Sequence, residues 1–427
     1  MTERNRPTVS FIIVNANGLA HLSPLLDSIR ALDYPQDLLS VWIVDNASTD
    51  GSREWLREHH PAVRVLENAT NEGFARPNNV AAARAEGEWL ALINNDMRLD
   101  AGWLQQMLGV ASETQAPCVA SRILNWDGSR LDFDGSELTF TGHGLQPGYG
   151  ARLTPPGSPR PIPFACGGAM LIARSVFLEV GGFDERYFAY YEDVDLGWRL
   201  WLQGHQVVLA PQALAFHRHN ATSKGAPSFQ KRVLMERNAL CSVLKNYEDE
   251  HLARILPAAL LLSLKRMAVR SAVDPSEFRF TLPGLPRETK ASRTPRSLPW
   301  QKVLPVLREQ GLAAVARKGM VMIAEQILRR WGRLPLAEGG VLVDRDSYAH
   351  LVAIEEVVDN LPALLKARAE IQAKRRRPDR EIFHLFGNPL QALEGTPSYL
   401  TAHEALASNW GIADLFERTR PAGEVVV

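Results

Sequence analysis

Short apolar runs alternate with helical patterns along the first part of the chain. Four of these runs have the length of buried strands, and they cover residues 9–14, 41–44, 63–66 and 89–93. The helices between them are expected to begin near Ser23-Pro24, at Asp50-Gly51-Ser52 and at Arg76-Pro77-Asn78, where proline or a capping side chain is well placed. Strands that alternate with helices in this way predict an α/β fold with a parallel sheet.

Polar residues stand where each predicted strand ends. They are Asn15 after the first strand, Asp45 and Asn46 after the second, Asn68 after the third, and Asn94, Asn95 and Asp96 after the fourth. The carboxyl ends of parallel strands meet at one edge of a sheet, and ligands bind at that edge in open α/β folds. The sequence therefore predicts a ligand site built from these side chains.

Composition sets limits on the architecture and the partners. A chain of 427 residues with 45% hydrophobic content can bury one large core and still form a smaller appendage, which indicates two domains. Lys and Arg number 48 together, as do Asp and Glu, so no global field favours nucleic acid and we expect no nucleic-acid partner. The three cysteines are odd in number and widely separated, which fits a reducing compartment.

The location of the protein follows from its apolar segments. Residues 1–8 are polar and lack the apolar stretch of a secretory signal, and the run 255–264 is about half of the roughly 20 residues that a membrane span needs. We therefore expect a cytoplasmic protein. Segments 252–269 and 312–328 are apolar on one side and are followed by Lys or Arg clusters, a pattern that suits a membrane surface and equally a packed helical bundle. Peripheral contact with the inner face of the plasma membrane stays open.

The segment 45–52 is the first with chemistry in it. A carboxylate at a strand end, here Asp45, can accept a hydrogen bond from a pyrimidine N3–H or a ribose hydroxyl. Ser48 and Asp50 can cap the following helix, and capping alone is the alternative interpretation of the whole segment. In the next polar block, Gly73 permits a close backbone approach, while the amides of Asn71 and Asn78 can bind a nucleotide or a sugar or cap the helix 78–85.

Glu192 and Asp193 follow an aromatic run and begin a predicted helix. An apolar wall raises the pKa of a carboxyl group, while the helix dipole opposes that shift, so such a carboxylate can act as a base. The alternative is an acidic pair that stabilises the first turn of the helix.

These blocks, at 45–52, 71–79, 94–96 and 191–199, recur in an order that resembles the family 2 glycosyltransferases, in particular their bacterial rhamnosyltransferase-like branch. The resemblance covers about residues 9–246. It implies a GT-A fold, a Rossmann-like mixed sheet flanked by helices, over residues 8–246, with an acceptor-side excursion at 124–163. A mostly helical appendage is expected at 247–387, and the role of the tail 388–427 is open.

The resemblance also implies a role for each site residue. Asp193 is the expected catalytic base, with Glu192 orienting the acceptor hydroxyl. Asp96 is the expected ligand of a Mg²⁺ or Mn²⁺ ion that bridges the two donor phosphates. His217 is a candidate further metal ligand, with His219 as its alternative. The expected donor-binding residues are Asn15, Asp45, Asn46, Asp50, Asn71, Gly73, Phe74, Asn78, Asn94, Asn95 and Gly168.

The predicted function is the inverting, metal-assisted transfer of a sugar from a nucleoside diphosphate sugar, UDP- or TDP-linked, to a glycan or lipid-linked acceptor, in cell-surface polysaccharide synthesis. A direct displacement needs no covalent intermediate, so we expect no nucleophilic role for Cys166. Asn94 and Asn95 stand where the family often has carboxylates, which keeps an inert sugar-nucleotide-binding subunit as one alternative. A nucleotidyltransferase of similar fold is the other, although the first turn, from Asn15 to Gly18, lacks a glycine-rich loop with a basic residue.

Overall fold

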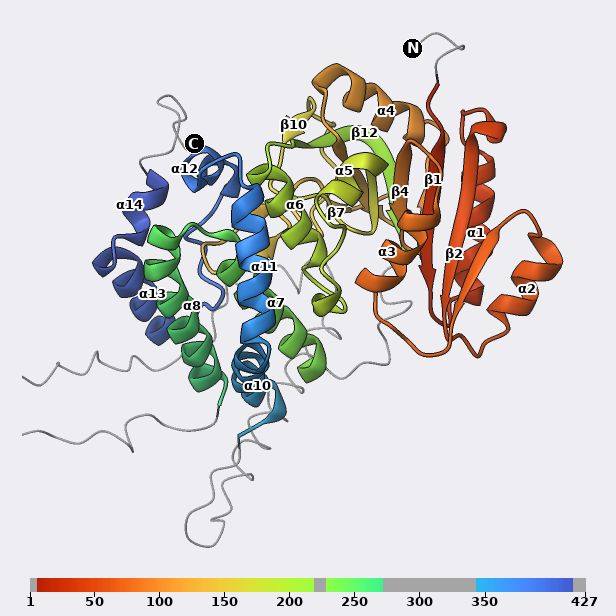
Figure 1. Ribbon diagram of the computed structural model, residues 1–427. Coiled ribbons are helices and arrows are strands. Elements are labelled where there is room, and N and C mark those ends of the chain that lie inside the picture. The colour runs from red at the N-terminus through yellow and green to blue at the C-terminus, as the bar shows by residue number, and fades with distance from the viewer. Residues whose placement is uncertain (1–5, 219–227, 272–342, 418–427) are drawn as a thin grey trace, which may run out of the picture.

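A mixed β-sheet forms the centre of the protein (Figure 1). The computed structural model describes residues 6–218, 228–271 and 343–417. The strands lie in the order β10, β12, β6, β11, β4, β1, β2 and β3, with β5 paired to β12 and β7 paired to β6. Their bounds are β1 Val9–Asn15, β2 Leu39–Asn46, β3 Arg64–Asn68, β4 Trp89–Ile93, β5 Met97–Leu99, β6 Cys118–Asn125, β7 Leu131–Phe133, β10 Arg160–Pro161, β11 Ala169–Ala173 and β12 Val207–His217. A separate hairpin joins β8 Glu137–Leu138 to β9 Gly144–Leu145.

The sheet is parallel in its first half and mixed beyond it. Strands β3, β2, β1 and β4 run parallel, as their alternation with helices predicts. Strand β11 is antiparallel to both of its neighbours, β4 and β6, and β12 then pairs parallel to β6. The four predicted strands are confirmed, and the predicted fourth strand matches β4 at both ends. The polar ends of β1, β2 and β4 therefore share one edge.

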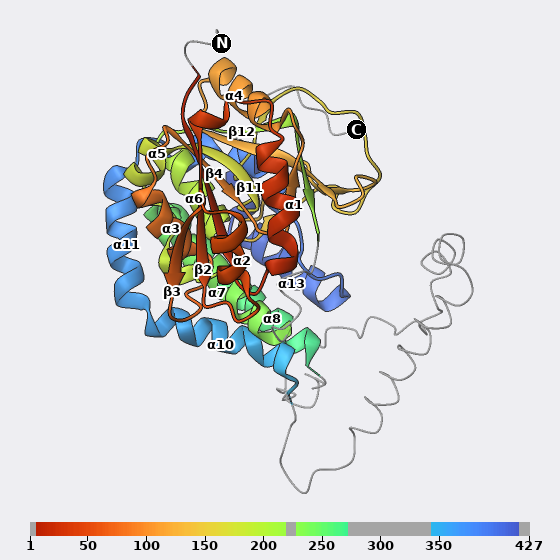
Figure 2. The same ribbon diagram turned by 90° about the vertical axis from the view of Figure 1, so that its right-hand side faces the viewer.

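Helices cover both faces of the sheet. Helices α1 and α3 lie on opposite sides of it (Figure 2), and α4 packs on β12 and β6. The helices of this part are α1 Leu19–Arg30, α2 Ser52–His59, α3 Ala75–Arg84, α4 Trp103–Thr114, α5 Arg174–Glu179 and α6 Glu192–Leu202, with short 3-10 turns η2 Gln36–Leu38 and η3 Glu185–Tyr187.

The predicted start of the first helix is wrong. Helix α1 begins at Leu19, four residues before Ser23, and Pro24 lies inside it. The backbone N–H of Leu19 donates to Asp50 Oδ2 at 2.8 Å, so a carboxylate from the loop after β2 caps the helix. Because this cap is distant in the chain, the local pattern around Ser23 could not indicate it.

The excursion 124–163 is a packed element. Its strand β7 pairs with β6, and Leu131, Phe133 and Phe140 are buried. Phe140 connects it to the C-terminal part, because its N–H donates to Pro389 O at 2.8 Å and its carbonyl accepts from Tyr247 Oη at 3.1 Å. The excursion thus lies between the sheet and the C-terminal helices.

The C-terminal part is helical and shares the core of the sheet domain. Its elements are α7 Ser228–Asn246, α8 Asp249–Arg270, α10 Arg345–Asp359, α11 Leu361–Lys374, α12 Asp379–Ile382, η5 Phe383–Phe386, α13 Pro397–Asn409 and α14 Ile412–Glu417. In Figure 1, α8, α13 and α14 lie beyond α11 as seen from β1 and β2. Side chains of this part, including Phe386 and Tyr399, belong to the same buried cluster as the residues of the sheet. The predicted fold class, a GT-A-like mixed sheet flanked by helices with a helical appendage, is confirmed.

The two amphipathic segments have different outcomes. Segment 252–269 lies within α8, which buries Ile255, Ala258 and Leu262 against other helices, as a packed bundle requires. Segment 312–328 lies outside the described residues, as does His219. In the parts of the chain that the structure describes, none of the helices combines the length and apolar character needed to cross a membrane.

Candidate active site

A chain of buried hydrogen bonds links the ends of three parallel strands. Asn95 Nδ2 donates to Asn15 Oδ1 at 2.9 Å, and Asn15 Nδ2 donates to Asp45 Oδ2 at 3.3 Å. Burial by itself would raise the pKa of Asp45, but hydrogen bonds from Ser48, Arg53 and Asn15 outweigh it, so the pKa is lowered. Asp45 is therefore an ionised, fully buried group that helps to hold the strand ends together.

Asp50 acts as a double helix cap. Its Oδ2 accepts from the N–H of Leu19, and its Oδ1 accepts from the N–H of Ser52 at 3.1 Å. Burial would raise its pKa, but these donors outweigh burial and lower it. These contacts agree with the capping interpretation of Asp50, which was the alternative to donor binding in the sequence analysis.

Asn46 organises the loop that carries Asn71 and Gly73. Its Nδ2 donates to Asn71 Oδ1 at 2.8 Å and to the carbonyl of Gly73 at 2.7 Å. Gly73 has φ +81°, and a Cβ atom there would stand 2.5 Å from the carbonyl oxygen of Phe188. Only glycine suits this position, because both the backbone conformation and the close approach exclude a side chain. Asn78 lies in the first turn of α3 and is buried. Its Nδ2 donates to the carbonyl of the N-cap residue Phe74 at 2.8 Å.

Asp96 meets His217 where β12 runs beside β5. His217 Nε2 lies 3.4 Å from Asp96 Oδ2, and His217 Nδ1 lies 2.6 Å from Asp132 Oδ2. Burial would lower the pKa of His217, but its hydrogen bonds to the two carboxylates outweigh burial and raise the pKa to about 9. Among the described residues, Asp96 Oδ1 has no hydrogen-bond partner although it is buried.

This arrangement fits a divalent cation. A buried carboxylate oxygen without a partner and an adjacent imidazole offer the hard oxygen and borderline nitrogen ligands that Mg²⁺ or Mn²⁺ takes. Asp132 would orient the ring of His217 through its Nδ1 atom, as carboxylates do behind histidine ligands. Because histidine ligates as neutral imidazole, metal binding and protonation of His217 compete.

A cavity of about 640 Å³ holds the carboxylate pair that begins α6. Its wall includes Phe74, Asn94, Gly168, Glu192 and Asp193, all of which the sequence predicted as site residues. Gly144, Leu145, Gln146 and Tyr149 of the excursion also line the cavity. Tyr190 and Lys231 of α7 contribute to the wall as well, and Lys231 Nζ lies 5.0 Å from the centre of the Tyr190 ring. The tertiary structure thus brings donor-side and acceptor-side candidates to one cavity.

The two carboxyl groups of this cavity have raised pKa values. Burial raises the pKa of Asp193, and hydrogen bonds from the N–H groups of Gly167 at 2.9 Å and Val194 at 2.8 Å oppose the rise without cancelling it. Burial, and next the charge of Asp193, raises the pKa of Glu192 well above its ordinary value. Within the described part of the chain, Glu192 Oε2 is buried and has no hydrogen-bond partner. Two neighbouring carboxyl groups that both have raised pKa values suit proton transfer at this site.

Cys166 also lines the cavity but is unsuited to nucleophilic attack. Burial raises the pKa of its thiol, and the neighbouring Asp193 charge raises it further. The thiol therefore stays protonated near neutral pH, whereas the thiolate is the nucleophilic form.

Sequence reasoning missed Asp132 and Arg53. Asp132 lies between two apolar residues in a short strand of the excursion, and it reaches His217 only because β7 and β12 both pair with β6. Arg53 Nε lies 2.5 Å from Asp45 Oδ1. Its position at the start of α2, eight residues after Asp45, is the one signal that could have pointed to this pair.

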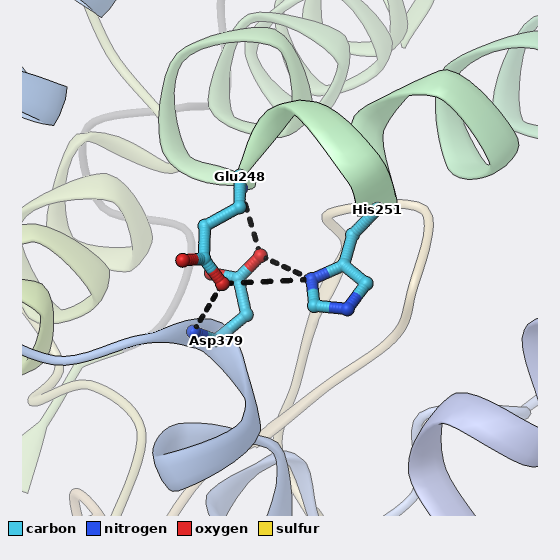
Figure 3. A group of neighbouring side chains, drawn as sticks. All are labelled: Glu248, His251 and Asp379. Atoms are coloured by element: carbon cyan, nitrogen blue, oxygen red, sulfur yellow. Dashed lines mark hydrogen bonds and ion pairs between the residues drawn. The ribbon is translucent and has the colours of Figure 1, made fainter.

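A second acidic and histidine cluster, Glu248, His251 and Asp379, lies in the C-terminal part (Figure 3). Asp379 Oδ2 accepts from the N–H of Glu248 at 2.8 Å and lies 2.8 Å from His251 Nδ1, while Asp379 Oδ1 lies 2.9 Å from Arg375 Nη1. In return, the N–H of Asp379 donates to Glu248 Oε2 at 2.9 Å. These contacts form a reciprocal cap between α8 and α12, and the adjacent arginine disfavours a cation.

The mixed sheet flanked by helices, with its helical C-terminal part, defines the GT-A-like fold class. The family model for glycosyl transferase family 2 matches residues 10–181, and a model described as the N-terminal domain of galactosyltransferase matches residues 149–222. The chain is 33% identical over 232 residues to the N-acetylglucosaminyl-diphospho-decaprenol L-rhamnosyltransferase of Mycobacterium tuberculosis, a match that covers 48% of this chain and 74% of that protein. The protein belongs to glycosyltransferase family 2 and is a sugar transferase.

Two further similarities are more limited. The O-antigen biosynthesis protein RfbC of Myxococcus xanthus is 31% identical over 236 residues, which are 52% of this chain and 18% of that protein. The solved structure of a mannosyltransferase from Pyrobaculum calidifontis covers 83% of this chain and 88% of its own chain at 17% identity, with a TM-score of 0.46. At that score the structural likeness supports no further conclusion, and family membership rests on the sequence matches.

Proposed function

We propose that this glycosyltransferase moves a sugar, with inversion, from a nucleoside diphosphate sugar to a hydroxyl group of a glycan or lipid-linked acceptor, in the synthesis of a cell-surface polysaccharide. The observation that carries the proposal is Asp193: a carboxylate with a raised pKa that accepts from the N–H of Gly167, in a cavity that Asn94 and Gly168 also line. The alternatives of an inert binding subunit and a nucleotidyltransferase have no comparable support.

Asp193 is the proposed base. The acceptor oxygen forms a bond to the anomeric carbon, the bond from that carbon to the donor phosphate breaks, and the nucleoside diphosphate leaves with the bonding electron pair. Asp193 takes the proton of the acceptor hydroxyl as its oxygen attacks. The N–H groups of Gly167 and Val194 keep the carboxylate oriented. A single displacement of this kind inverts the anomeric carbon.

Glu192 is the proposed partner of the acceptor. Its raised pKa favours the protonated form, which can donate a hydrogen bond as well as accept one. Its buried Oε2 atom lacks a partner among the described residues, and an acceptor hydroxyl would satisfy it.

Asp96 and His217 are the proposed ligands of Mg²⁺ or Mn²⁺, with Asp132 holding the histidine ring. When bound, the metal ion would neutralise charge that develops on the leaving diphosphate. Asn94 and Gly168 line the cavity on the donor side, while Asn15, Asp45, Asn46 and Asn95 hold the strand ends and the loop of Asn71 in place. A UDP- or TDP-sugar is the proposed donor.

The name of the mycobacterial relative supports the choice of acceptor. That protein is named for the transfer of L-rhamnose to a diphospho-decaprenol-linked N-acetylglucosamine. By analogy, we propose a lipid-linked acceptor and a place at the cytoplasmic surface of the membrane. Leu261 and Leu264 on α8 are exposed apolar side chains beside Lys265, and they suit such a surface.

A donor panel tests the function. TDP-rhamnose, UDP-N-acetylglucosamine and GDP-mannose would be incubated with Mn²⁺ or Mg²⁺, and both binding and turnover would be measured for wild type, Asp96→Ala and Asp193→Asn. We expect one donor to bind with metal, Asp96→Ala to abolish that binding, and Asp193→Asn to bind without turnover. Normal turnover by Asp193→Asn would show that the base is misassigned.

A further inference from the structure

The segment that leads into the base has an unusual backbone. Phe188, Tyr190 and Tyr191 have φ angles of +62°, +67° and +66°, a region that bulky residues rarely adopt. Tyr191 is the N-cap of α6, so this conformation is followed at once by Glu192 and Asp193. Backbone in such conformations persists only where surrounding contacts hold it.

Asn238 of α7 supplies contacts of that kind. Its side-chain Nδ2 lies 3.0 Å from the carbonyl oxygen of Tyr187, 3.0 Å from that of Ala189 and 2.6 Å from that of Tyr190. The side chain is fully buried. One amide group with two N–H donors therefore lies within hydrogen-bond distance of three carbonyl oxygens of the irregular backbone, of which the Tyr187 carbonyl also accepts from the N–H of Ala189 at 2.7 Å.

Arg237, the neighbouring residue, fixes the orientation of that amide. Its Nε donates to Asn238 Oδ1 at 2.9 Å, which turns Asn238 Nδ2 toward the segment. Its Nη2 donates to the carbonyl of Tyr187 at 3.0 Å, and its Nη1 lies 2.7 Å from Glu356 Oε2 of α10. The C-terminal helices thereby connect to the backbone that precedes the base.

The other side of the segment contacts the proposed donor loop. The carbonyl of Phe188 accepts from the N–H of Phe74 at 2.6 Å and from that of Ala75 at 3.2 Å. The same carbonyl makes the close approach that requires glycine at Gly73. The segment is therefore held between α7 and the loop that leads into α3.

We infer that Asn238 and Arg237 are positioning residues that hold residues 187–191 in this backbone conformation and thereby place Asp193 at the cavity. The inference rests on the proposed function, in which Asp193 is the base. Neither residue lines the cavity that contains Asp193. The donor loop keeps its own anchor, because Asn46 donates to Asn71 and to the carbonyl of Gly73. The effect of losing Asn238 is therefore expected to fall on the proton-transfer step more than on donor binding.

The first test measures the backbone directly. Hydrogen exchange of the amides of residues 188–194 would be compared between wild type and Asn238→Ala, with the amides of β4 as an internal reference. We expect protection of the segment to fall by about tenfold or more, with β4 unchanged. Unchanged protection of the segment would overturn the inference, whatever the substrate proves to be.

The second test separates turnover from binding. With the panel sugar nucleotide that wild type uses, Asn238→Ala is expected to lower kcat by about tenfold or more. The Kd of the matching free nucleotide, TDP, UDP or GDP, should change by less than about twofold. Gln230→Ala, an exposed change on the same helix, is the control for α7.

Leu262→Ala in the core of α8 controls for lost stability. If Leu262→Ala lowers kcat as much as Asn238→Ala does, the inference is overturned.

A rescue experiment distinguishes backbone strain from packing. In the Asn238→Ala background, Phe188→Gly should recover part of kcat, because glycine adopts a positive φ without penalty. Phe188→Ala removes the same ring but keeps the penalty, so it should not recover kcat, and equal recovery by both would contradict the inference. Asp193→Asn is measured in parallel. If Asp193→Asn turns over normally, the base assignment fails, whereas an inactive Asp193→Asn beside a fully active Asn238→Ala refutes the positioning role alone.

Discussion

Lys245 is a buried lysine whose removal tests how the charges behind α6 contribute to stability. Its Nζ lies 2.5 Å from Asp184 Oδ2 and 2.9 Å from Asp195 Oδ1, and the lysine is fully buried. Burial alone would raise the pKa of each carboxyl group, but Lys245 and a neighbouring arginine outweigh burial and hold both pKa values below the ordinary range.

The expected loss follows from what remains after Lys245→Met. Asp184 keeps Arg186 at 2.7 Å, and Asp195 keeps Arg199 at 2.8 Å. Removing one partner of a buried ion pair costs about 3–5 kcal/mol, and the remaining arginines favour the lower end, about 3 kcal/mol. At about 2.1 cal/mol/K per residue, a chain of 427 residues has an unfolding entropy of about 0.9 kcal/mol/K, so that cost lowers Tm by roughly 3 °C.

The pH dependence has a defined sign. A carboxyl group whose pKa is lowered on folding stabilises the protein above its unfolded pKa, and this stabilisation is lost as the pH falls through the folded pKa. The Tm difference between wild type and Lys245→Met should therefore be full near pH 7 and should shrink below about pH 4. Scanning calorimetry across this range measures it, with Lys366→Met on the exposed face of α11 as the control. A Tm difference below about 1 °C near pH 7, or one that does not change with pH, would refute the reasoning.

Three further predictions concern the site. The acid limb of the kcat profile should lie above pH 3.8, the ordinary pKa of an Asp side chain, because burial raises the pKa of Asp193; a limb at or below that value would contradict the assignment. Gly73→Ala should cost about 1–3 kcal/mol of unfolding free energy, because its Cβ would meet the carbonyl of Phe188; denaturant titration checks this, and a neutral result would show that the approach is not tight. Asp132→Asn should weaken Mn²⁺ binding by about 10–100-fold in a calorimetric titration, because His217 loses its orienting carboxylate; unchanged affinity would exclude that role.

Local patterns predicted the strands well and the first helix poorly. The run from Trp89 to Ile93 is apolar throughout and bounded by polar residues, so its length alone indicated β4. The start of α1 depends on Asp50, which lies 31 residues from Leu19. The residues around Ser23 therefore could not predict that contact.

The candidate site divides in the same way. Asp193, Glu192 and Asp96 were predicted because each stands in a recognisable block at a strand end or a helix start. Asp50 was placed with the donor on the same grounds, and the structure uses it as a cap between two helices. Asn238 stands in an ordinary helical pattern, and only its three carbonyl contacts reveal what it holds.

The sequence by itself determined the strand and helix pattern, the chemical types at the strand ends and the family, because these depend on hydrophobic period and short motifs. Only the tertiary structure shows which polar side chains cap helices. It also shows that Asp132 contacts Nδ1 of His217 and that Asn238 of α7 contacts the backbone before Asp193. The physical reason is that a buried hydrogen bond depends on which segments meet in space, and pairing through β6, or packing on α7, brings together residues that are distant in the chain.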